Sequence, residues 1–281
     1  MHDDLVVGPA GAQRSMSTYD WQVGDAAEAT GPAVTAARFA LSAMVLPSLA
    51  DALAVGDRVR MALLRCSNGH PVFTGRNGDG QVKRGPRHDH ASFLPADDDD
   101  DGVVDHVVVY ARGGFDLAAL QSLAQLRRVW GHGGPELTVM LVGMGSPREL
   151  GCLRRDERGG CTAQLGTARV WESLTPFVPP WHIRYRPSGV RAAPHEQVAR
   201  LLTLYGRPPA QIEPLAPEQA TLPRPPSIPW QRFQRRRASG GGSRGADLAF
   251  GFRLCFDQPV AGPIALGYAA HQGLGQFVAV A

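Results

Sequence analysis

The sequence predicts an α+β protein built from two ferredoxin-like (RRM-like) units in tandem, the second of them degenerate. Three observations lead to this prediction. Strand-like and helix-like segments follow one another in the order β-α-β-β-α-β over residues 33–145, which is the ferredoxin-like order. Shorter segments of the same kinds recur over 146–281, and a glycine-rich run over 262–277 lies near the end of the chain.

Hydrophobic periodicity and capping residues define the first unit. Pro47 opens a helical run to Arg65 with its apolar residues on one stripe, and Asp116 is placed to cap a second helix that ends before Gly131. The predicted elements are a strand over 34–45, a helix over 47–65, strands over 88–94 and 103–111, a helix from 116, and a strand over 136–144. We expect an antiparallel sheet with both helices on one face and the other face free for a ligand.

The second unit has weaker patterns because prolines interrupt it. Its predicted parts are a loop or hairpin over 145–168, a strand over 168–177, a helix over 194–205, irregular chain over 206–230, a basic and then flexible segment over 231–246, and two or three strands over 248–281. Residues 1–32 are small and polar, which indicates a flexible lead-in or the remnant of a linker.

Composition excludes several classes of protein. The 281 residues are 43% hydrophobic and 20% charged, enough to form a core, so global disorder is not expected. No run of 18 apolar residues occurs and the first residues do not resemble a secretory signal, so we expect a cytosolic protein with no membrane partner. The four cysteines include no CxxC pair, which argues against a disulfide framework or a four-cysteine zinc site; we expect them to be buried.

Positive charge is carried by arginine and is concentrated in one segment. Lys83 is the only lysine among 29 basic residues, and arginines cluster over 224–244. Guanidinium groups bind phosphate bidentately and stack on bases, and Trp230 and Phe233 are interleaved with the arginines. This pattern indicates an anionic partner such as RNA, and a solvated basic loop is the alternative. The candidate RNA-binding residues here are Arg232, Arg235, Arg236, Arg237 and Arg244.

The acidic run over 97–105 has the spacing of the front of a calcium loop. Oxygen donors stand at Asp97, Asp99, Asp101 and Asp105, with the Val103 carbonyl and a glycine at position 102. The bidentate glutamate expected at position 12 is replaced by valine. We therefore predict a structural Ca²⁺, or less favourably Mg²⁺, and a solvated acidic turn is the alternative.

Histidines supply the candidate catalytic groups. His88 and His90 would share one face of a strand, and imidazoles can act as general acid and base near neutral pH. His106, on the next predicted strand, faces the same way in one of the two possible registers. Metal ligation and a structural polar edge are the alternatives for the pair. His182 follows a proline-rich aromatic stretch, where a structural role is the more common one.

Glycines in the run over 262–277 allow a backbone to approach a phosphate or a sugar closely. The candidate positions are Gly267, Gly273 and Gly275. The run is neither a Walker loop nor a dinucleotide fingerprint, because the required lysine and spacing are absent. Strands kinked by glycine are the alternative interpretation.

Four stretches together resemble a known family. They are RHDHASFLPADDDDDGVVDHVVVYARGGFD (87–116), WESLTPFVPPWH (171–182), IEPL (212–215) and GFRLCFDQPVAGPIALGYAAHQGLGQF (251–277). The chain is similar to the C-terminal, RNA-processing half of the type I-G (formerly I-U) CRISPR-associated subunit of the RAMP superfamily. In that subunit a backbone-capping domain is fused to a CRISPR repeat-RNA endonuclease. The capping half has no counterpart in this sequence.

The resemblance implies tandem ferredoxin-like folds, a glycine-rich loop that contacts RNA, and metal-independent cleavage of precursor CRISPR RNA within the repeat. A histidine would take the proton of a ribose 2′-OH, which attacks the adjacent phosphate to give a 2′,3′-cyclic phosphate and a 5′-hydroxyl. No catalytic cofactor is implied, so a cation at 97–105 would be structural. His90 is the expected base and His88 the acid or an orienting partner; His182 and His271 are substitutes, since the helix over 47–65 lacks a histidine.

The implied partners are the repeat stem-loop of CRISPR RNA and the backbone, large and capping subunits of a type I surveillance complex in a prokaryotic cytoplasm. Target DNA would be reached only through that complex. Two other functions stay open. The chain could be a non-catalytic subunit that holds guide RNA, or a metal-dependent hydrolase that uses His88, His90 and nearby aspartates.

Overall fold

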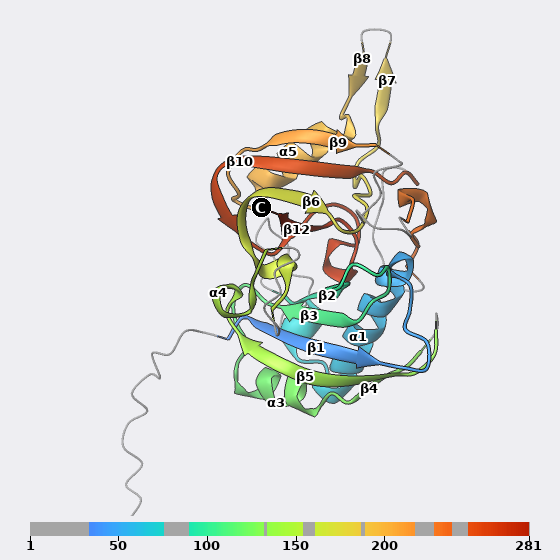
Figure 1. Cartoon of the computed structure of the whole chain (residues 1–281), viewed down its shortest axis with the longest axis vertical. Helices are drawn as coiled ribbons and strands as arrows, with labels where there is room; N and C mark the ends of the chain where they lie inside the picture. The colour runs from blue at the N-terminus through green and yellow to red at the C-terminus, as the bar shows by residue number, and fades with distance from the viewer. Residues whose placement is uncertain are drawn as a thin grey trace, which may run out of the picture. The chain divides into compact units, whose positions relative to one another are not determined.

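A computed structural model describes residues 34–75, 90–131, 134–153, 161–186, 189–216, 228–237 and 247–280. All of them belong to one compact unit that contains two five-stranded antiparallel sheets and a separate two-stranded hairpin (Figure 1). The predicted lead-in over 1–32 lies outside the described residues. The predicted α+β class is confirmed, and the predicted domain boundary after residue 145 stays a prediction.

The first sheet has the strand order β2-β3-β1-β5-β4. Its strands are β1 (Ala36–Ser42), β2 (Ser92–Ala96), β3 (His106–Tyr110), β4 (Arg128–Val129) and β5 (Leu137–Gly145). Every pairing in it is antiparallel. The short strand β4 adds to the edge of an arrangement that is otherwise the predicted ferredoxin-like one.

Two helices form the layer behind this sheet. They are α1 (Ala52–Cys66), entered through a 3-10 turn η1 (Leu49–Asp51), and α3 (Leu117–Gln125); a single helical turn, α2 (Pro71–Thr74), follows α1. The Ser48 side chain accepts a hydrogen bond from the Ala50 N–H at the entrance to η1. The Asp116 carboxylate accepts one from the Ala119 N–H at 2.8 Å, so the predicted cap is confirmed.

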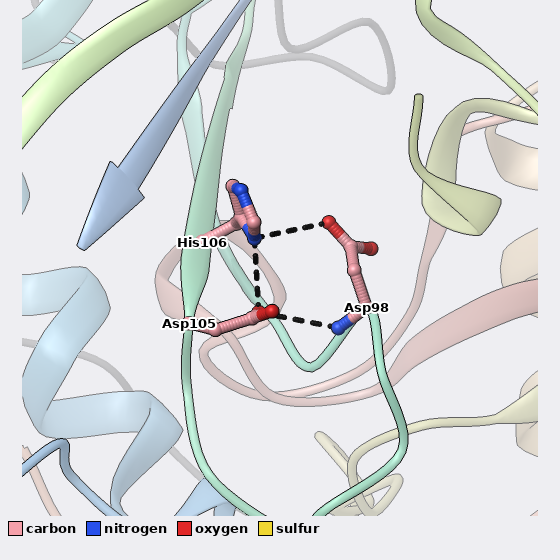
Figure 2. Close-up of side chains that lie close together, drawn as sticks. All are labelled: Asp98, Asp105 and His106. Carbon is pink, nitrogen blue, oxygen red and sulfur yellow. Dashed lines mark hydrogen bonds and ion pairs between the residues drawn. The ribbon is translucent and has the colours of Figure 1, made fainter. Parts of the chain in front are cut away.

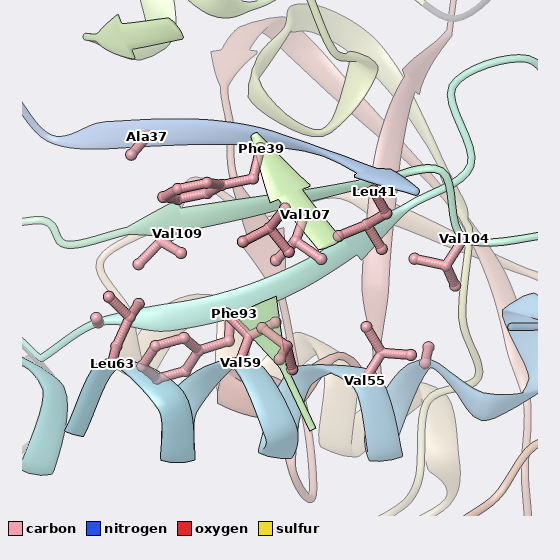
Figure 3. Close-up of a cluster of buried hydrophobic side chains, with 14 of the residues drawn as sticks. Ala37, Phe39, Leu41, Val55, Val59, Leu63, Phe93, Val104, Val107 and Val109 are labelled. Atoms are coloured by element: carbon pink, nitrogen blue, oxygen red, sulfur yellow. The ribbon is translucent and has the colours of Figure 1, made fainter. Parts of the chain in front are cut away.

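The first core lies between α1 and the sheet. Phe39 of β1 and Val107 of β3 point toward Val55 and Val59 of α1, and Phe93 of β2 lies beside them (Figure 3). Trp230 and Phe233 from the second half of the chain belong to the same core and are 1% and 2% exposed. Their predicted role as RNA-stacking aromatics is therefore wrong, because both rings are buried against the protein.

The second sheet has the order β11-β12-β6-β10-β9. Its strands are β6 (Thr167–Ser173), β9 (Gln211–Leu215), β10 (Gly251–Ala261), β11 (Ile264–Ala265) and β12 (Gln276–Val280), with helix α5 (Pro194–Leu204) between β6 and β9. The strands β9, β10, β6 and β12 repeat the ferredoxin-like order. Where the second helix would stand, between β10 and β12, the chain forms β11 and a 3-10 turn η4 (Ala270–Gln272).

Strand β9 corrects the prediction that residues 206–230 are irregular. Pro214 lies within the strand, where it pairs with Phe252 of β10. Proline is tolerated because β9 is the edge strand, so one side of its backbone has no strand to donate to. The segment over 145–168, predicted as a loop or hairpin, contains α4 (Pro147–Leu150) and a 3-10 turn η2 (Ala163–Leu165), and its residues 154–160 lie outside the described residues.

The hairpin of β7 (Arg184–Arg186) and β8 (Gly189–Arg191) stands out from the second sheet (Figure 1). No helix in the described part of the chain is long and apolar enough to cross a membrane. Cys66 is exposed and Cys161 and Cys255 are half-buried, so the expectation that all four cysteines are buried is confirmed only for Cys152.

The prediction that the outer face of the first sheet is free for a ligand is wrong. Leu94 and Val108 on this face are buried in a small cluster with Leu150 and Leu165 from the second half of the chain. The second half therefore covers the strands β2 and β3. A cavity remains beside this cluster, lined by residues of both halves.

Candidate functional site

Two of the predicted catalytic histidines lie together. The ring centroids of His90 and His271 are 4.2 Å apart with an angle of 35° between the ring planes. Ser92 Oγ lies 2.8 Å from His271 Nδ1 and fixes the orientation of that imidazole. His90 precedes the first residue of β2 and lies in a bend, so the prediction that it sits within a strand is wrong.

Neither His182 nor His106 joins this pair. His88 and Asp89 lie outside the described residues. His182 is exposed and follows Trp181, whose backbone N–H and C=O are both hydrogen-bonded by the Gln197 side chain. His106 pairs with Ala96, so it lies on the same face of the sheet as Ser92 but at the opposite end of the β2–β3 ladder.

Close packing of the glycine-rich loop brings His271 to this place. Gly267, Gly273 and Gly275 all have positive φ angles, of 97°, 103° and 61°. A Cβ atom at Gly267 would lie 2.7 Å from the Val178 carbonyl oxygen, and one at Gly273 would lie 2.9 Å from that of Ala52. The protein's own packing thus requires glycine at these positions, and contact with RNA stays a prediction for them.

Gly56 is a residue of this site that sequence reasoning missed. It lies in the middle of α1, where glycine costs about 1 kcal/mol relative to alanine. A Cβ atom there would collide with the backbone carbonyl of Gln272, at the end of η4. The signal available in the sequence was a glycine inside a strongly helical stretch, which marks a close approach of another backbone.

A cavity of about 490 Å³ opens beside His271 and Ser92. We call it the arginine cavity, because Arg112, Arg148 and Arg207 line it together with Tyr110 and Tyr205. Among the described residues that line it there is no aspartate or glutamate. The remaining walls are mainly small and apolar residues of the Ala261–Leu266 turn.

Arg207 is the most enclosed arginine of this cavity. Its Nη1 donates to the Ala261 carbonyl oxygen at 2.6 Å, and its Nη2 donates to that of Pro263 at 2.8 Å. Burial lowers the pKa of Arg207, and the neighbouring charge of Arg112 lowers it further, whereas Tyr110 opposes the shift. Burial also raises the pKa of Tyr110, which keeps its hydroxyl protonated as a hydrogen-bond donor.

The predicted RNA-binding arginines are largely engaged within the protein. Arg235 and Arg236 both form ion pairs with Asp247. Arg237 contacts both carboxylate oxygens of Asp57 on α1, at 3.2 and 3.3 Å. Arg232 lies in the 3-10 turn η3 (Trp230–Arg232), and Arg244 lies outside the described residues. RNA binding by this group stays a prediction.

The predicted calcium loop is divided by the fold into two clusters. Asp97, Asp99 and Asp101 offer oxygens within 4.8 Å of one another, as a cation site would require. Asp105, predicted to join them, instead accepts a hydrogen bond from the Asp98 N–H. Val103 forms a backbone bridge with Ser48.

The Asp97 carboxylate already accepts hydrogen bonds from the N–H groups of Gly102 at 2.9 Å and Asp101 at 3.1 Å. Burial raises its pKa to about 7, against the lowering effect of these two hydrogen bonds. The residues that fit a cation are therefore three of the five predicted. The cation itself stays a prediction.

The second cluster joins Asp98, Asp105 and His106 (Figure 2). His106 Nδ1 lies 3.1 Å from an Asp105 oxygen and 3.4 Å from an Asp98 oxygen. Arg38 Nη2 donates to the same Asp98 oxygen at 2.9 Å, and Thr162 donates to the other one at 2.9 Å. Because Arg38 already supplies a positive charge to Asp98, this cluster ties the two halves together without a metal ion.

Comparisons with known proteins give structural neighbours only. No family model and no curated protein matches the chain. The fold is similar to a structure described as a RAMP protein binding different RNA substrates, with a TM-score of 0.41, 14% identity, and coverage of 88% of this chain and 98% of that one. It is also similar to a CRISPR-associated protein Cas6 (TM-score 0.41, 8% identity, 89% and 99% coverage) and to a Cas6 product complex (TM-score 0.40, 13% identity, 88% and 99% coverage).

Proposed function

We propose that the chain is an endoribonuclease that cleaves precursor CRISPR RNA within the repeat and keeps its product as a subunit of a type I-G surveillance complex. One observation carries the proposal: the ring centroids of His90 and His271 lie 4.2 Å apart beside a cavity whose described lining includes three arginines and no acidic residue. The arrangement supplies proton transfer and phosphate binding at one place.

The chemistry needs one imidazole that accepts a proton and one that donates a proton. Two imidazolium charges at this separation would repel each other, which disfavours protonation of both rings at once. The neutral ring takes the proton of the ribose 2′-OH as its oxygen attacks the phosphorus. The protonated ring donates to the 5′-oxygen as the P–O bond breaks, which leaves a 2′,3′-cyclic phosphate and a 5′-hydroxyl.

Positive charge next to the histidines supports the proposal. Charge that develops on the phosphate oxygens in the transition state is stabilised by donors that are already in place. Arg112 and Arg148 line the same cavity as His271, and both are exposed. In this mechanism the imidazoles transfer protons and the guanidinium groups stabilise the phosphate, so no metal ion is required.

The test uses RNA that co-purifies with the protein, sequenced and resynthesised as the substrate. We expect His271→Ala and His90→Ala each to lower the single-turnover cleavage rate at least 100-fold, since general acid–base catalysis contributes about 10²–10⁴. The matched control is His195→Ala, an exposed histidine on α5, which should cleave like the unaltered protein. A 2′-deoxy substitution at the cut site should abolish cleavage, and EDTA should not.

The results separate the proposal from its two competitors. RNA that is bound tightly but never cut would identify a non-catalytic guide-RNA subunit, for which the acid-free cavity is already a sufficient binding surface. Cleavage that persists with the 2′-deoxy substrate and stops in EDTA would identify a metal-dependent hydrolase. Equal activity of the His271→Ala and His195→Ala proteins would contradict the assignment of the site.

A further inference from the structure

We propose that the arginine cavity is a nucleotide pocket that takes one unstacked ribonucleotide of the RNA chain, with its phosphate on the arginines and its base between the tyrosines. The inference rests on the proposed function, because it identifies what lies beside the catalytic histidines. It goes further by assigning a half-open pocket for a single nucleotide rather than a flat basic surface.

The first support is the size of the cavity. Its volume of about 490 Å³ lies in the range of sites that bind small molecules, and double-helical RNA is too wide to enter such a space. A nucleotide must therefore leave its stack to occupy it. Single-stranded RNA recognised by proteins commonly presents its bases in this way.

The second support is the charge of the lining. Arg112, Arg148 and Arg207 line one cavity, and no aspartate or glutamate stands among its described lining residues. The charge of Arg112 is felt by Arg207. Bringing like charges together is unfavourable unless an anion is bound between them. Arg207 is held in place by two backbone carbonyls, whereas Arg112 and Arg148 are exposed and able to close on a phosphate.

The third support is the placement of aromatic and small residues. Tyr110 ends β3 and Tyr205 follows α5, so one tyrosine comes from each half of the protein. Base–aromatic stacking is worth about 1–3 kcal/mol per base and accepts any base. The apolar turn over 261–266 completes a wall that would exclude water from a base.

The experiment measures binding to the full-length protein in the absence of cleavage, so its failure is separable from failure of the proposed function. The probes are a 2′-fluoro trinucleotide that cannot be cut, UMP, AMP, uridine and inorganic phosphate, each followed by calorimetry at low salt. We expect UMP and AMP to bind at least tenfold more tightly than uridine or phosphate. Uridine has no phosphate to contact the arginines, and inorganic phosphate has no base to stack on the tyrosines. The trinucleotide should bind more tightly than either mononucleotide.

Arg112→Gln and Arg148→Gln should each weaken trinucleotide binding about tenfold, since both side chains are exposed and their loss should not disturb folding. Each should also reduce the slope of log K against log salt by about 0.7, as expected for one lost phosphate contact with a single strand. The control is Arg169→Gln, an exposed arginine on β6 outside the cavity lining, which should leave binding unchanged.

Three results would overturn the inference. Mononucleotides that bind no better than inorganic phosphate would show that the cavity does not recognise a base. Mononucleotides that bind as tightly as the trinucleotide would assign the pocket to a free nucleotide instead of the RNA chain. An equal effect of the Arg112→Gln and Arg169→Gln changes would show that the bound probe lies elsewhere. In each case loss of RNA cleavage in the His271→Ala protein would still uphold the proposed function.

Discussion

The carboxyl group of Asp97 is expected to make the protein less stable as pH rises from 5 to 8. The residue is 6% exposed, and burial raises its pKa to about 7 from an ordinary value of 3.8. The change Asp97→Asn keeps the size of the side chain and removes the titration. It leaves one carbonyl oxygen to accept the N–H groups that the carboxylate accepts at present, those of Gly102 and Asp101.

The sign follows from the direction of the shift. Because the folded state holds the proton more tightly than the unfolded state, the stability contributed by Asp97 is fully present below pH 3.8 and is lost as pH rises through about 7. A difference of about three pKa units at about 1.4 kcal/mol per unit sets a ceiling of about 4 kcal/mol. About 2 kcal/mol of that ceiling is expected to be lost between pH 5 and pH 8.

Urea unfolding at pH 5 and pH 8 measures the effect. The Asp97→Asn protein should lose about 2 kcal/mol less free energy of unfolding between these pH values than the unaltered protein. The matched control is Asp101→Asn, which changes an exposed carboxylate of the same loop and should preserve the original pH dependence. If the Asp97→Asn and Asp101→Asn proteins show the same pH dependence, burial does not control the protonation of Asp97.

Three other predictions concern the packing of the two halves and the acidic loop. Thr162→Val should lower the free energy of unfolding by about 1–2 kcal/mol in urea titrations, because it leaves an Asp98 oxygen without its donor; an unchanged value would mean that water replaces the hydroxyl. Gly275→Ala should lower the melting temperature more than Gly206→Ala, since both glycines have φ near 60° but only the first is crowded by backbone; equal losses would contradict this. Millimolar Ca²⁺ should raise the melting temperature of the unaltered protein and not that of Asp99→Asn, and no rise at all would make the calcium prediction wrong.

The first half of the fold was predictable because its signals are local. The apolar stripe of α1 and the cap at Asp116 act within a few residues, and the structure confirms both. The acidic turn between β2 and β3 also lies where the sequence indicated. Strand β9 was missed because Pro214 normally argues against a strand, and its position at the edge of a sheet depends on how the whole sheet is ordered.

The candidate site was predictable only in part because its residues come from distant parts of the chain. Ser92 and His271 are 179 positions apart, and only the packing of the glycine-rich loop on α1 brings them together. Arg207 belongs to no sequence motif, so nothing in the sequence singles it out. Most of the residues that line the cavity with it are distant from it in the sequence. At Trp230 the sequence indicated a functional residue that the structure does not support. Its place among arginines predicted stacking on RNA bases, but the side chain is buried in the core.

The position of the site at the junction of the two halves explains why so much packing is concentrated there. His90 and Ser92 come from the first sheet and its approach, whereas His271 comes from the turn that replaces the second helix of the second unit. A glycine at position 56 lowers the stability of α1 relative to alanine, but it allows the backbone at Gln272 to lie directly on the helix. The loss of a regular helix between β10 and β12 is therefore the structural condition for the site, because a helix there could not place His271 against Ser92 while its neighbouring glycines pack on α1 and β2.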